Sequence, residues 1–128
     1  MEKMKIVQIN SVYNFGSTGK IVSNIHYHLQ TKDHSSYVFY GRKKISKTEN
    51  IRYISNPFSI FFHVLLTRLM GLHGFGSLIP TYLLIKKIKK INPQIIHLHN
   101  IHGYYLNLFL LGICLGLLRG LSFIPLLI

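Results

Sequence analysis

Two groups of residues in this sequence have types and spacings that suit chemistry. In the first, Phe15-Gly16-Ser17-Thr18-Gly19, two glycines enclose two hydroxyl residues just before a helical pattern. Glycines let a backbone turn tightly and approach a ligand closely, and the N–H groups that begin a helix favour an anion. The pattern predicts that Gly16, Ser17, Thr18 and Gly19 bind a diphosphate or a sugar phosphate.

Neither common phosphate fingerprint is complete in this stretch. It contains no G-x-G-x-x-G, and Asn14 and Ile21 break a Walker A pattern despite the Gly19-Lys20 pair. The other interpretation is an ordinary turn from strand to helix, in which Ser17 or Thr18 caps the helix. The spacing alone leaves both interpretations open.

The second group is rich in histidine and consists of His97, His99, Asn100, His102 and Gly103. In a strand, His97 and His99 point to the same face, whereas His102 lies past the strand end. Imidazoles gathered in this way suit metal binding or acid/base chemistry. Because no nearby carboxylate or thiolate completes a metal set, we expect no metal and interpret the cluster as a substrate-facing surface.

The elements that must position these groups follow from hydrophobic periodicity. Buried strands are predicted around residues 6–9, 37–40, 51–54 and 94–98, and helices over 21–29, 58–70 and 78–91. The helix at 58–70 is apolar on nearly every side, which predicts a buried helix. We expect Ser77 to cap the last helix and Asn92-Pro93 to end it.

Alternating strands and helices predict an α/β fold, a Rossmann-like parallel sheet of about four strands with helices on both faces. In open sheets of this class, ligands bind beyond the carboxyl ends of the strands. The 16–19 segment and the His99-Asn100 pair both follow strands. We therefore expect the two groups to converge on one crevice.

The chain has 128 residues, about one domain, and a net charge of +12 from fifteen Lys and Arg against three acidic residues. This imbalance favours anionic partners. The lysine clusters match no nucleic-acid-binding motif, so we expect no nucleic acid. The basic run Gly41-Arg42-Lys43-Lys44 is interpreted as a solvated loop, although Arg42 could meet a phosphate. The first ten residues lack the apolar core of a signal peptide, which predicts a cytoplasmic protein.

Three runs in this order, INSVYNFGSTGKIV, LLTRLMGLHGFGS and KINPQIIHLHNIHGYYLN, together resemble the N-terminal domain of bacterial family 4 glycosyltransferases. Such enzymes serve capsule, lipopolysaccharide and colanic-acid-type exopolysaccharide biosynthesis. The resemblance spans residues 4–107 and implies a GT-B enzyme, which transfers a sugar from a nucleotide-sugar donor to a glycan or lipid-linked acceptor. It implies no cofactor and no metal.

The resemblance also implies roles for both groups of residues. The donor phosphates would be approached by Gly16, Ser17, Thr18 and Gly19. The acceptor cleft would be bordered by His97, His99, Asn100, His102 and Gly103.

The end of the chain departs from the family pattern. Residues 110–128 are almost entirely apolar, where family members continue with a W-T-x-H-D-type segment and a donor-binding domain. We therefore expect residues 1–108 to be a partial N-terminal domain, an incomplete half of a GT-B enzyme and inactive alone. Residues 109–128 would be an aberrant or truncated tail, either partly ordered or a membrane-spanning helix interrupted by Arg119.

A second function class stays open. A small basic chain with an apolar end is also suited to binding an anionic membrane surface without catalysis. In either case, we expect association to be peripheral, at the inner face of the plasma membrane.

Overall fold

The computed structural model describes residues 2–45, 48–55, 57–71, 77–101, 105–116 and 122–125. The strands are β1 (Lys5–Asn10), β2 (Ser35–Tyr40), β3 (Ile51–Tyr53), β4 (Ile95–Leu98) and β5 (Ser122–Pro125). The helices are α1 (Gly16–Thr31), α2 (Pro57–Met70), α3 (Leu78–Ile91) and α4 (Leu108–Gly116).

The strands form one sheet in the order β3-β2-β1-β4-β5, and each neighbouring pair is parallel. This order confirms the predicted Rossmann-like α/β fold. The chain first builds outward from β1 to β3 and then crosses to β4, so the direction of building reverses between β1 and β4. Ligands of such sheets bind at this reversal, beyond the carboxyl ends of the strands.

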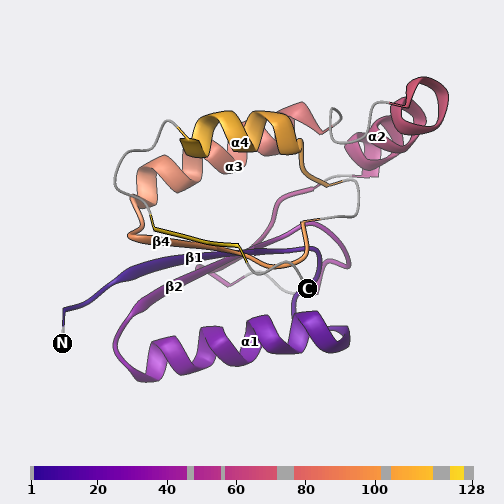
Figure 1. Cartoon of the computed structure of the whole chain (residues 1–128). Coiled ribbons are helices and arrows are strands. Elements are labelled where there is room, and N and C mark those ends of the chain that lie inside the picture. Colours follow the sequence, from indigo (N-terminus) through magenta and orange to yellow (C-terminus); the bar gives the residue numbers. More distant parts are fainter. Residues whose placement is uncertain are drawn as a thin grey trace.

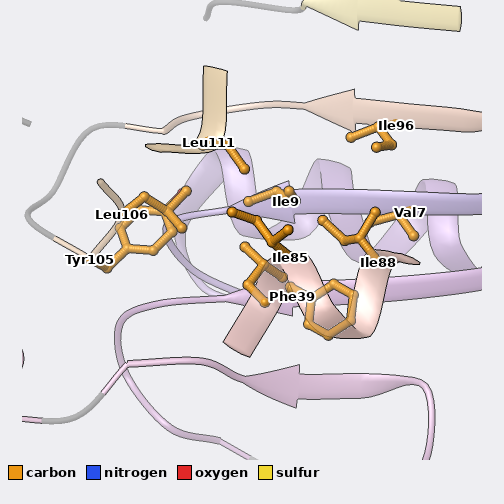
Figure 2. Packing of buried hydrophobic residues seen from close by; sticks show 10 residues of the cluster. Val7, Ile9, Phe39, Ile85, Ile88, Ile96, Tyr105, Leu106 and Leu111 are labelled. Carbon is orange, nitrogen blue, oxygen red and sulfur yellow. The ribbon is translucent and has the colours of Figure 1, made fainter. Parts of the chain in front are cut away.

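Helices cover both faces of the sheet, with α1 on one face and α3 and α4 on the other (Figure 1). Because strand side chains alternate, Val7 and Ile9 of β1 pack into the cluster that contains Ile85 and Ile88 of α3 (Figure 2). The opposite cluster joins Val22 of α1 to residues of β2 and β3. The central strand β1 is therefore buried on both faces, which fixes the position of its carboxyl end.

The apolar end of the chain contributes to this sheet. Helix α4 lies against α3, and β5 pairs in parallel with β4, so the described part of the tail continues the β–α–β pattern. Over the part of the chain that the structure describes, the sheet thus has five strands, one more than the four expected. Within the described residues, no helix is both long and apolar enough to cross a membrane.

Helix α2 contradicts the prediction of a buried helix. Only His63 and Thr67 of this helix are buried. Its large apolar side chains are exposed, namely Phe58, Phe61, Phe62, Leu65, Leu69 and Met70. Periodicity shows that a helix needs apolar surroundings, but it cannot show that the sheet of the same chain provides them.

The helix starts differ in part from the sequence interpretations. Phe15 is the N-cap of α1, so Ser17 and Thr18 lie inside its first turn. Ser77 occupies the N-cap position of α3 but makes no side-chain cap hydrogen bond. Its Oγ is instead hydrogen-bonded to Nδ1 of the buried His63, at 3.0 Å. The Ser77 hydroxyl therefore links α2 to the start of α3.

Candidate functional site

The carboxyl ends of β1 and β4 are joined where the strand order reverses. Oδ1 of Asn10 accepts a hydrogen bond from the backbone N–H of Asn100 at 3.1 Å. The backbone N–H of His99 donates to the carbonyl oxygen of Ile9 at 2.9 Å. These two bonds bring the ends of the strands, and the segments that follow them, to one edge of the sheet.

The predicted phosphate-binding segment forms the first turn of α1 at this edge. Gly16 and Ser17 are exposed and Thr18 is half-buried. No side chain caps this turn and no acidic residue lies in it, so the helix start keeps its partial positive charge. The arrangement suits an anion that accepts hydrogen bonds from the backbone N–H groups.

The two glycines of the segment have different structural roles. Gly16 has a φ of +63°, a conformation that side chains disfavour, and a Cβ there would meet open space. Gly19 is buried, and a Cβ there would lie 3.2 Å from both the backbone nitrogen of Asn14 and Cγ2 of Val12. Gly19 therefore allows close packing beneath the turn, whereas Gly16 shapes its exposed end.

The basic loop after β2 lies beside this turn. The backbone N–H of Arg42 donates to the carbonyl oxygen of Ser11 at 2.8 Å. Nζ of Lys43 lies 3.2 Å from the centre of the Phe15 ring, a cation–π contact. Arg42 and Lys43 are exposed, as the interpretation of a solvated loop predicts, yet they border the start of α1.

The location of these two cations near the start of α1 has a signal in the sequence. The signal that identifies them is their position directly after a strand that neighbours β1. In a parallel sheet, residues that follow adjacent strands emerge at the same edge.

The histidine cluster is mostly internal. His97 and His99 point to the same face, as predicted, with ring centres 3.9 Å apart. Nε2 of His99 is hydrogen-bonded to Oε1 of Gln8 at 3.0 Å. Nε2 of Gln8 lies 3.5 Å from Oγ of Ser36, which is bonded in turn to Nδ1 of His26 at 2.8 Å. A row of polar side chains thus runs from β4 across β1 and β2 to α1.

Burial keeps these imidazoles neutral. It lowers the pKa of His97 and of His26, and burial together with the nearby His97 lowers the pKa of His99 to about 4. Nε2 of His97 is buried and has no hydrogen-bond partner among the described residues. Near neutral pH, the row consists of neutral donors and acceptors within the protein.

The predicted acceptor-cleft residues therefore differ in their access to a ligand. Asn100 is half-buried at the sheet edge and His97 is partly exposed, but His99 is only 3% exposed. His102 and Gly103 lie outside the described residues. Over the described ranges, no group of three or more His, Cys, Asp or Glu side chains could hold a metal ion.

No protein-family model, curated protein or solved structure matches this chain. The fold and the geometry of the carboxyl edge are therefore the basis for proposing a function.

Proposed function

We propose that this chain is a glycosyltransferase-like domain whose carboxyl edge binds the diphosphate of a nucleotide-sugar donor. The observation that carries the proposal is the convergence of an uncapped helix start with two cations. Nζ of Lys43 lies over the ring of Phe15, the N-cap of α1, and the backbone N–H of Arg42 is bonded to Ser11, directly after β1.

Each group has a defined part in this proposal. The N–H groups of Gly16, Ser17 and Thr18 donate to phosphate oxygens, because the start of a helix stabilises an anion. The Arg42 guanidinium offers a planar pair of donors to a second phosphate face. Asn100 lies across the β1–β4 junction, on the side proposed for the acceptor.

The same groups would assist transfer of the sugar. When an acceptor hydroxyl attacks the anomeric carbon, negative charge develops on the departing diphosphate, and fixed donors stabilise that charge. The resemblance implies a glycan or lipid-linked acceptor and a second domain that holds the sugar nucleotide. The contribution proposed for the present domain is diphosphate binding and one wall of the cleft.

Calorimetric titration with UDP and with uridine tests the proposal. We expect UDP to bind and uridine to bind much more weakly, because uridine lacks the diphosphate. The variant R42Q/K43Q should lose about tenfold or more in UDP affinity, since each charge-assisted hydrogen bond contributes roughly 1.5–3 kcal/mol. The charge-matched control K3Q/K32Q removes two exposed lysines far from the edge. An equal loss in both variants, or no UDP binding by the folded chain, would reject the proposal.

A second candidate function, a basic module that binds membranes, is favoured by α2. Figure 1 shows α2 standing clear of the sheet, beyond the start of α3. Phe58 is 86% exposed and Leu69 is 74% exposed, a costly arrangement in water. Arg68 lies on the same helix and exposed lysines follow on α3. Aromatic side chains beside cations suit the interface of an anionic bilayer, so we propose peripheral membrane binding through α2.

A further inference from the structure

A cavity of about 500 Å³ lies between α3 and the side of the sheet that holds β2 and β3. Lys5 begins β1 and Ile91 ends α3, and both residues line this cavity. Phe39 of β2 also lines the cavity and packs with α3, so the cavity lies on the α3 face of the sheet. The proposed donor site lies at the start of α1, which covers the other face (Figure 1). It is therefore a separate site.

The lining of the cavity is strongly basic. Four cations line it, Lys5, Arg52, Lys87 and Lys90, and Glu49 is the one acidic residue among the described lining residues. Nε of Arg52 donates to the backbone carbonyl oxygen of Glu49 at 3.2 Å, which fixes the guanidinium without using the carboxylate. Positive charge is thus in excess around a pocket that is open to solvent on one side.

Lys87 shows the consequence of this arrangement. It is half-buried, and burial together with the nearby Arg52 lowers the pKa of its ammonium group. Like charges that share a partly dry site destabilise one another. A bound anion would offset this repulsion and would be held by several cations at once.

Two aromatic side chains, together with Asn50 and Ile91, complete the lining. Tyr37 and Phe39 of β2 line the cavity, and Phe39 also packs with Ile88 in the core (Figure 2). Tyr37 and Phe39 form the floor of the cavity beneath α3.

We propose that this cavity binds a small phosphate-bearing polyanion, with its phosphate groups on Arg52 and Lys87 and any apolar portion against Tyr37. Phosphate matches the planar donor pair of arginine and the point charge of lysine better than a single carboxylate does. A diphosphate carries enough negative charge to offset the excess of cations in the lining.

Lysine acylation followed by mass spectrometry tests the proposal on the unmodified chain, with inorganic pyrophosphate as the probe. Lys86 and Lys89 are exposed on the same helix and do not line the cavity, so they serve as internal controls. We expect pyrophosphate to slow acylation of Lys87 and Lys90 and to leave Lys86 and Lys89 unchanged. No protection, or equal protection of all four lysines, would overturn the proposal.

Variants separate this site from the donor site. R52Q/K87Q should lower the affinity for pyrophosphate that is measured by protection of Lys90, by about tenfold or more. K86Q/K89Q and R42Q/K43Q should leave that affinity unchanged. Citrate tests the ligand class, because it is a polyanion without phosphate. Citrate protection as strong as that of pyrophosphate would overturn the assignment to phosphate.

Discussion

Oδ1 of Asn10 accepts a hydrogen bond from the backbone N–H of Asn100 at 3.1 Å, joining the carboxyl ends of β1 and β4. The same side chain donates through Nδ2 to the carbonyl oxygen of Val12 at 2.7 Å. Asn10 therefore satisfies backbone groups on both sides of the strand reversal. It sets the distance between the start of α1 and the segment after β4.

Replacement of Asn10 by alanine should destabilise the fold and weaken UDP binding. It leaves two partly buried backbone groups without their partner, which costs about 2 kcal/mol or more. Urea unfolding measures the first effect and calorimetry the second. N24A is the matched control, because Asn24 is exposed on α1. Equal stability of N10A and N24A would contradict the role given to Asn10.

Gly41→Ala should destabilise the protein by about 1–3 kcal/mol through overpacking. A Cβ at Gly41 would overlap the ring of Tyr105, which is fully buried and donates to the carbonyl oxygen of Asn100. Gly112→Ala is the control, because no atom lies within 4 Å of its added Cβ and the site is exposed on α4. In urea unfolding, the free energy of unfolding of G41A should be well below that of the wild type, and that of G112A should equal or exceed it.

Stability should fall in mild acid, with His99 as the main contributor beside His97 and His26, whose pKa values are also lowered by burial. The pKa of His99 is about 4 in the folded state against 6.5 ordinarily, so the unfolded chain binds a proton that the folded chain refuses. The contribution of neutral His99 to the free energy of unfolding is complete above about pH 6.5. It is lost as the pH falls through about 4. This pKa difference of about 2.5 units between the unfolded and folded states corresponds to about 3 kcal/mol of stability.

Urea unfolding at pH 7.5 and at pH 4.5 measures this dependence. With three acidic residues in the chain, carboxylate protonation can add little to the same slope. H99Q should flatten the dependence while keeping a hydrogen-bonding group near Gln8. H28Q, at an exposed position of α1, should keep the wild-type slope. Identical slopes for H99Q and the wild type would show that His99 is not responsible.

Membrane binding through α2 predicts a loss on removing its aromatic side chains. F58S/F61S should reduce binding to phosphatidylglycerol vesicles by at least about tenfold, because each buried Phe contributes roughly 1.5–3 kcal/mol. The control I21S/Y27S removes two exposed apolar residues from α1, on the other side of the sheet. Sedimentation with vesicles should separate the two variants, and equal binding by both would exclude α2 as the contact.

Much of the fold could be predicted because its signals are local. The helix at Leu78–Ile91 has the predicted bounds, and the strand at Ile95–Leu98 follows the proline break as expected. The burial of α2 could not be predicted, because it depends on whether another element covers the helix. Ser77 occupies the predicted N-cap position, but its hydroxyl bonds to His63 of another helix instead of to its own first turn, which local pattern cannot show.

The candidate site was predicted in part. The placement of the 16–19 segment and of Asn100 at one edge follows from the parallel direction of the strands, which the alternation of strands and helices predicts. The hydrogen bond between His99 and Gln8 joins residues that are 91 positions apart in the sequence. A local sequence pattern cannot predict such a bond. Lys43 was placed beside Phe15 by the fold, not by a motif.

Residue-resolved NMR of the ¹⁵N-labelled chain during a UDP titration tests the central claim most directly. Chemical shifts of the backbone N–H groups report on the donors that are proposed to hold the diphosphate. We predict large changes at Gly16, Ser17 and Thr18, with smaller ones at Arg42 and Lys43. Changes confined to other regions, with these amides unmoved at saturating UDP, would contradict the proposed donor site.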